Sequence, residues 1–482
     1  MRTGWKIKQW TAFAPIAVMI VGCALGPDGR PAALVQSKVD SRLNVETSPQ
    51  TTRVTVLPDQ PTSAVEPVVD PMSESDDTRE LSLESLQKIA LDNNPSLRQV
   101  EAAVRRAAGI QHQVGLNPNP RLGYFADEVG DNSSSGLQGA FISQTFIRGD
   151  KLTANRHVLA HDLELMKWHA EAQRERVLTD VEVNFYRVLT SQRRLTLARE
   201  FREVAVQGLS VAQDRLEAGG TRQDVLQSEI QLSEIDLLIQ RTELEVSAAW
   251  KQLAAIAGVP EMTRSTLIGD LPTSQVSRSS DSVYQHVLEE SPALRAANQR
   301  LYRAQSNLRR QQVQPISNVT GQMGVGHDHA TGDEFINLQI SLPLPVNNTN
   351  QGNIYAAKAT VDEAVENLER LKMRIRSELA DVMREYEIAI STRKQYEAII
   401  LPKAKESERL IADTYATGEV DFLRVLTARK MYFDANLEYV NAQGDQAVAN
   451  ARIEGFLLSG GLLEVPTYPA DDSLRGQALS SQ

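Results

Sequence analysis

The stretch FINLQISLPLP, at residues 335–345, decides how the rest of the chain is interpreted. Aliphatic and polar side chains alternate along it, and successive side chains of an extended chain point to opposite faces. The stretch therefore predicts a β-strand with one apolar face and one polar face. The apolar side chains are those of Ile336, Leu338, Ile340 and Leu342, and the polar side chains are those of Asn337, Gln339 and Ser341.

The rest of the chain has the composition of a helical protein. Aromatic residues make up 5% and charged residues 23%, and Ala, Leu, Glu, Gln and Arg are abundant, which favours long helices. We expect very long helical stretches at about 151–217 and 353–416, interrupted by proline only at Pro402. The first stretch would extend roughly 100 Å. Each stretch then reverses into another helix, at about 222–257 or 420–457. Helices of this length are expected to be held by coiled-coil packing.

The sequence repeats its plan. Asn94-Pro95-Ser96-Leu97-Arg98 is echoed by Ser291-Pro292-Ala293-Leu294-Arg295, and residues 140–146 are echoed by 338–344. Each copy begins with a helix of about 30 residues, near 82–115 and 281–312, that stops before a proline. A pair of strands follows in each copy, at about 119–128 with 136–147, and at 317–327 with 333–344. We therefore expect an internal duplication.

The four strands explain the two faces of residues 335–345. The smallest single-chain barrels in outer membranes have about 8 strands, so four strands cannot close alone. We therefore expect several chains to contribute four strands each to one barrel. Lipid would lie outside, against Ile336, Leu338, Ile340 and Leu342, and water would lie inside.

The N-terminus has the features of a secretory signal. Positive charges precede the apolar run AFAPIAVMIVG, which ends at Cys23 and is too short to span a membrane as a helix. The residues Ile20-Val21-Gly22-Cys23 resemble a bacterial lipobox, so residues 1–22 are expected to be a lipoprotein signal peptide and Cys23 a lipidated residue. Residues 23–80 are expected to form a polar tether. A plain signal peptide that happens to contain a cysteine is the alternative.

Several function classes are excluded. The net charge of −11 argues against a nucleic-acid partner. The single cysteine excludes disulfides and all-cysteine metal sites within one chain. The motifs GxxxxGK[ST], HExxH and GxSxG are absent, so we predict neither an enzyme nor a cofactor. Gly321, Gly324 and Gly326 lie in an expected strand, where they are interpreted as small residues of a barrel wall.

Two histidine pairs are weak metal candidates. His327 and His329 flank Asp328 in an expected outer turn, and His157 and His161 are spaced four residues apart on a long helix. A polar surface loop and a solvated helix face are the simpler interpretations. We therefore expect no firm metal site.

The turns at the far ends of the long helices contain the candidate gate. Gly219 and Gly220 end the first stretch and Gly418 the second, which predicts chain reversals there. In an oligomer, carboxylates near these turns would form rings that favour cations, and nearby arginines could pair with them to hold the tip closed. The alternative is ordinary surface charge at coiled-coil ends. The candidate carboxylates are Glu217, Asp224, Glu419 and Asp421, and the candidate arginines are Arg215, Arg222 and Arg424.

Taken in order, these features resemble the TolC-type outer-membrane efflux proteins, over residues 81–461. The resemblance rests on the doubled NPSLR/SPALR element, on Arg215-Leu216-Glu217-Ala218-Gly219, and on Tyr415-Ala416-Thr417-Gly418. The spacing from Gly219 to Leu226 is one residue shorter than that from Gly418 to Leu426, so the first turn is expected to differ in shape. Residues 342–353 resemble the heavy-metal-cation (CzcC/CusC-like) branch.

The resemblance implies a mainly α fold with a membrane β part. Duplicated helical hairpins would form an α-barrel tunnel in the periplasm, and a homotrimer would form a 12-stranded transmembrane β-barrel from four strands per chain. The expected partners are outer-membrane lipid, a periplasmic adaptor (membrane fusion protein) and an inner-membrane RND-type pump. The function implied is the passive exit duct of a tripartite efflux system, conducting cargo that includes divalent heavy-metal cations in the branch.

The alternatives to a channel are a periplasmic adaptor, which would have one helical hairpin within small β domains, and a structural coiled-coil lipoprotein, which would leave the four strands and the duplication unexplained.

The expected domain organisation follows the duplication. The first repeat is expected at 81–260 with its hairpin at 119–147, an equatorial linker at 261–280, the second repeat at 281–461 with its hairpin at 317–344, and a C-terminal tail at 462–482.

Overall fold

The computed structural model describes residues 80–130, 135–273, 278–417, 420, 422–464 and 473–480. These residues belong to one compact unit, Ser75–Gln482. The predictions about Cys23, Gly418, Glu419 and Asp421 lie outside the described residues.

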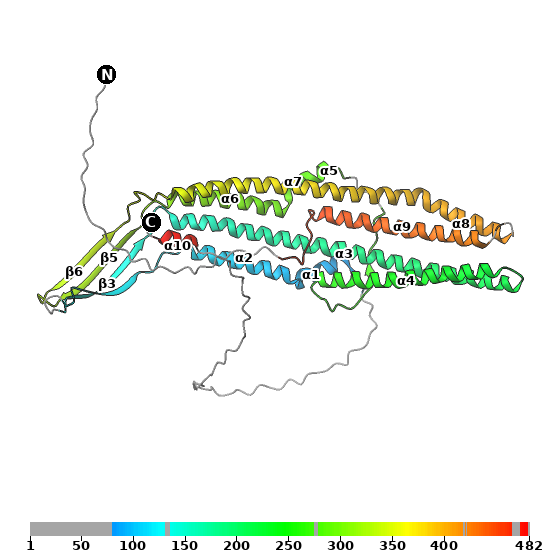
Figure 1. Cartoon of the computed structure of the whole chain (residues 1–482), viewed down its shortest axis with the longest axis horizontal. Coiled ribbons are helices and arrows are strands. Elements are labelled where there is room, and N and C mark those ends of the chain that lie inside the picture. Colours follow the sequence, from blue (N-terminus) through cyan, green and yellow to red (C-terminus); the bar gives the residue numbers. More distant parts are fainter. Residues whose placement is uncertain are drawn as a thin grey trace, which may run out of the picture. The chain divides into compact units, whose positions relative to one another are not determined.

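A similar plan occurs twice along the chain: a pair of helices, a pair of strands, a long helical stretch and a returning helix (Figure 1). The first set is β1 (Leu81–Ser82), α1 (Leu83–Asn93), α2 (Pro95–Gln113), β2 (Arg121–Asp127), β3 (Leu137–Phe146), α3 (Lys151–Glu217), α4 (Arg222–Ile256) and β4 (Leu267–Ile268). The second is α5 (Ser280–Glu290), α6 (Pro292–Val313), β5 (Val319–Asp328), β6 (Glu334–Ser341), α7 (Gln351–Gln395), the π-helix η2 (Tyr396–Ile400), α8 (Leu401–Ala416) and α9 (Phe422–Glu454), followed by α10 (Ser473–Leu479).

The expected helices at 82–115 and 281–312 are each two helices, which corrects the prediction. Asn94 has ψ 122° and separates α1 from α2, and Ser291 has ψ 122° and separates α5 from α6. Each of these residues precedes a proline, whose ring disfavours the helical conformation at the residue before it. The Asn94 side chain then caps α2 by accepting a hydrogen bond from the Ser96 backbone N–H at 2.9 Å.

The long stretch that contains Pro402 is also interrupted. Its hydrogen-bond ladder widens to the π-helix η2 immediately before Leu401 and Pro402. A proline removes one backbone donor and its ring crowds the carbonyl four residues earlier, and a wider turn relieves that clash. By contrast, α3 runs unbroken over 67 residues, as predicted.

The helices pack as a row with two open sides. Toward the strands, α3 lies between α2 and α6, and α6 packs against α7; toward the tip, α3 lies between α4 and α9, and α9 packs against α7 and α8. Figure 1 shows the strands at one end of α3 and α7 and the helical turns at the other. Within the described part of the chain, α2 and α4 therefore end the row on one side, and α7 and α8 end it on the other.

Two hydrophobic cores hold the short elements α1, β4 and α5 against the long helices. In the first core, Val181 and Phe185 of α3 pack against Leu86 of α1 and Leu267 of β4. β4 and β1 pair in parallel and form a two-stranded sheet that was not predicted from the sequence. The second core packs Leu379, Val382 and Tyr386 of α7 against Val283 and Val287 of α5. Among the described residues, no helix is long and apolar enough to cross a membrane.

Candidate functional site

The four longer strands form one antiparallel sheet in the order β2-β3-β5-β6. Residues paired across neighbouring strands lie on the same face, so the register shows which side chains share a surface. One row across the sheet is Leu122, Ile142, Met323 and Leu338, and the next is Tyr124, Ala140, Val325 and Ile336.

These two rows form a continuous exposed apolar surface, called here the apolar face. Leu122 is 83% exposed, Ile336 76% and Leu338 73%, while Ile340 continues the same face. Leu342 lies just beyond the end of β6 but is also exposed. Isolated apolar side chains are normal on a soluble surface, but a contiguous apolar patch marks a lipid or protein contact.

The opposite face of the sheet is more polar. Arg121, Ser143, Gln322 and Gln339 form one row across it. Glycines on this face make room for aromatic rings: a Cβ at Gly326 would lie 2.7 Å from the Phe335 ring. The alternation of the sequence predicts the two faces on β6, whereas glycines interrupt the alternation in β5.

At the tip, a small apolar cluster, called here the tip cluster, joins the two helical hairpins. Its buried members come from α3, α4 and α9, and Tyr415 of α8 packs against it. Gly219 turns the chain between α3 and α4 with φ +97°, a conformation that favours glycine. The tip cluster consists of Ala212, Val225, Phe422, Val425 and Leu426.

Several of the charged residues predicted at the tip lie within the described part of the chain. The Arg215 guanidinium lies over the Tyr415 ring, 4.3 Å from its centroid. Glu217 and Arg222 are exposed, and Asp224 lies in the first turn of α4. Within the described part of the chain, neither Arg215 nor Arg222 has a carboxylate within ion-pair distance. Arg424 is exposed in the first turn of α9.

The histidine pairs have few partners for a metal. His157 is exposed, whereas His161 Nδ1 lies 3.1 Å from Gln299 Oε1. The rings of His327 and His329 lie 4.9 Å apart at the end of β5. No group of three or more candidate metal ligands occurs among the described residues.

The middle of α3 carries a carboxyl group that sequence analysis did not identify. Burial, reinforced by the nearby Glu454 carboxylate of α9, raises the pKa of Glu182 to about 7. Its pKa in an unfolded chain is 4.5, so ionisation destabilises the folded state as pH rises from 4.5 to 7. Below pH 4.5 the group is neutral in both states and has no such effect.

Glu182→Gln is therefore expected to stabilise the protein at pH 8 by about 1–2 kcal/mol per subunit, and to leave it nearly unchanged at pH 4. Thermal unfolding of the purified protein at both pH values measures this. Glu200→Gln, an exposed change on the same helix, is the control and should show no such pH dependence. An equal gain at both pH values would contradict the assignment.

Known proteins share this architecture. The chain is 22% identical to the cobalt-zinc-cadmium resistance protein CzcC of Cupriavidus metallidurans over 378 residues, which cover 78% of this chain and 90% of that relative. It superposes on the outer membrane protein VceC of Vibrio cholerae with a TM-score of 0.64 at 18% identity, covering 78% of this chain and 96% of VceC. A structure of CusC also gives 0.64, at 17% identity, covering 78% of this chain and 92% of CusC.

A family model described as outer membrane efflux protein matches residues 86–259 and 283–457. The mainly helical fold with four antiparallel strands agrees with that of the solved channels. Because the family model covers well over half of the chain, the protein belongs to the outer membrane efflux protein family.

Proposed function

We propose that three copies of this outer-membrane efflux channel form the exit duct of a tripartite efflux system. Each copy contributes four strands to a shared 12-stranded transmembrane barrel and a row of helices to a periplasmic tunnel. A periplasmic adaptor and an inner-membrane RND-type pump deliver the cargo. The duct conducts it passively, since members of this family are channels and not enzymes.

The observation that carries this proposal is the sheet with one apolar face and two free edges. Among the described residues, β2 and β6 each pair on one side only. Unpaired backbone N–H and C=O groups at a sheet edge are costly in a bilayer. A sheet whose apolar face contacts lipid therefore needs strands from other copies to pair with β2 and β6. The open sides of the helical row also support a partner copy on each side.

Two further features belong to the proposal. Lipidation of Cys23 anchors the protein to the outer membrane, and the polar segment after it acts as a tether. The tip between the Gly219 and Gly418 turns opens for transport, and Glu217, Asp224, Glu419 and Asp421 favour cations there. Similarity to a relative named for cobalt, zinc and cadmium resistance supports divalent heavy-metal cations as the first cargo to test.

The native mass of the mature protein, purified in detergent from its host membrane, tests the assembly. We expect a trimer whose subunits each begin at an acylated Cys23. A monomer would contradict the shared barrel, since four strands cannot close alone. A trimer of subunits without acyl chains would contradict the anchor but leave the channel intact.

A further inference from the structure

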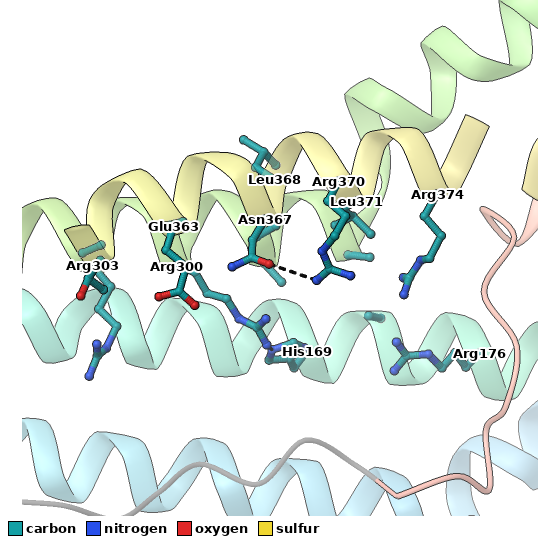
Figure 2. Close-up of a pocket in the computed structure, with 17 residues that line it drawn as sticks. His169, Arg176, Arg300, Arg303, Glu363, Asn367, Leu368, Arg370, Leu371 and Arg374 are labelled. Carbon is teal, nitrogen blue, oxygen red and sulfur yellow. Dashed lines mark hydrogen bonds between the residues drawn. The ribbon is translucent and has the colours of Figure 1, made fainter. Parts of the chain in front are cut away.

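A cavity of about 460 Å³ lies where α3, α6 and α7 meet. Figure 2 shows Arg300, Arg303, Arg370 and Arg374 in the space between α7 and α3, with Arg176 and His169 on α3. Five guanidinium groups thus line one cavity, called here the arginine cavity. Glu363 is the one carboxylate among its described lining residues.

Most of these arginines have neutral partners. The guanidinium of Arg370 donates to Asn367 Oδ1 at 3.0 Å, and that of Arg176 donates to Gln173 Oε1 at 3.2 Å. Two carboxylates also act on the arginines: Arg303 pairs with the Asp162 carboxylate at 2.6 Å, and the nearby Asp180 carboxylate partly offsets the lowering of the pKa of Arg176.

His169 does not add to the positive charge. Burial, with a contribution from Arg300 and Arg176, lowers the pKa of His169 to about 4, so its ring is neutral at physiological pH. Its Nε2 lies 3.3 Å from a guanidinium nitrogen of Arg300, which identifies it as an acceptor. The arginine cavity therefore retains an excess of positive charge, and like charges held this close favour an anionic ligand.

The two sides of the arginine cavity occupy matched positions in the repeats. Arg374 follows Arg176 by 198 residues, the same offset that relates residues 140–146 to 338–344. The two guanidiniums are close enough that Arg374 contributes to lowering the pKa of Arg176, after the larger effect of burial.

Two arginines of the cavity and two core residues occupy different sides of the same helices. Arg176 precedes the buried Val181 by five residues, which places the two side chains about 140° apart around α3. Arg374 precedes the buried Leu379 by the same interval on α7. Val181 packs toward α1 and β4, and Leu379 packs toward α5. Arg176 and Arg374 therefore do not point directly at α1, β4 or α5, although Leu368 and Leu371 line the cavity and also pack against the second core.

The inference rests on the trimer proposed above, in which the helical rows of three copies enclose a bore and the arginine cavity lies on its wall.

We infer that the arginine cavity binds multivalent oxyanions of the carboxylate or phosphate type as they pass along the duct. Guanidinium groups bind these groups through paired, charge-assisted hydrogen bonds. The cavity lies well down the helices from the strands, so the ligand is a solute and not a lipid headgroup.

Current through the full-length trimer in planar bilayers of neutral lipid tests the inference. Pyrophosphate and citrate, added separately in potassium chloride, are the phosphate and carboxylate probes. We expect both to reduce the current in a saturable way, and the double variant Arg176→Gln/Arg374→Gln to raise the half-blocking concentration about tenfold or more. A response to only one probe identifies the oxyanion group that the site selects.

Arg376→Gln is the matched control. Arg376 lies two residues from Arg374, but its guanidinium is over the ring of Tyr284 on α5, 5.4 Å from the centroid, and so lies on the core side. We expect this change to leave the block unaltered. Equal block in the wild-type protein and the double variant would overturn the inference.

A titration of pyrophosphate into the detergent-purified protein, followed by calorimetry, separates the two proposals. Saturable binding that the double variant loses supports the oxyanion site even if no current is measured. A conducting trimer that binds neither probe overturns the site and leaves the channel proposal standing. A monomer that conducts nothing overturns the channel proposal.

Discussion

Leu338→Arg is expected to prevent assembly of the folded trimer in the outer membrane. Leu338 lies in the middle of β6 on the apolar face, in one row with Met323, Ile142 and Leu122. An arginine facing lipid near the middle of a bilayer costs about 2–4 kcal/mol, and a trimer carries three copies. The cost falls on the assembled barrel, so unassembled protein should accumulate.

The adjacent change Gln339→Arg is the matched control. Gln339 is on the same strand as Leu338, but its side chain lies on the polar face of the sheet, where Gln339 pairs with Gln322 of β5. The same charge would there face water, and we expect normal assembly. The measurement is the fraction of outer-membrane protein that migrates as a trimer without heating and as a monomer after heating. Equal trimer fractions for the two variants would show that the apolar face does not contact lipid.

The pair of changes also shows why this part of the fold could be predicted. A strand repeats every two residues, so one strand with clean alternation, such as β6, reveals both faces from sequence alone. In β5, Gly321 interrupts the apolar face and Gly324 and Gly326 lie on the opposite face, so apolar and polar side chains do not alternate clearly. The contribution of Met323 and Val325 to the apolar face becomes evident only from their pairing with Leu338 and Ile336.

Other elements could not be predicted from the sequence, for related reasons. The parallel pair β1 and β4 has two residues in each strand and joins positions almost two hundred residues apart, too short for any periodicity. The helix α10 has seven residues, too few for a clear helical periodicity. It is fixed by contacts from distant residues, such as the hydrogen bond from Asn318 Nδ2 to the Ala478 carbonyl at 2.7 Å.

The candidate site was also predicted in part. The turn at Gly219 follows from a glycine after a long helix, whereas the contact between Arg215 and Tyr415 requires two helices to meet. The arginine cavity could not be predicted from the sequence for the same reason, because its residues come from three helices, α3, α6 and α7. Single arginines on long amphipathic helices are ordinarily solvated, and only their convergence makes a site.

Phe422→Ala is expected to increase conductance through the isolated trimer several-fold. Phe422 is 3% exposed in the tip cluster, where it begins α9 and packs with residues of α3 and α4. Truncation of a buried phenylalanine costs about 3–5 kcal/mol of packing. At the tip this loss loosens the contact between the two hairpins, so the closed arrangement loses stability relative to an open one.

Phe433→Ala is the control that distinguishes gating from general destabilisation. Phe433 lies farther along α9, is 7% exposed, and stacks on Phe201 of α3 with ring centroids 4.1 Å apart. Its loss should lower the thermal stability by a similar amount, because it also joins α3 to α9. It should leave the conductance unchanged, because it is remote from the tip. If both changes raised the conductance equally, the tip cluster would be one part of a uniformly stabilised tunnel and not its gate.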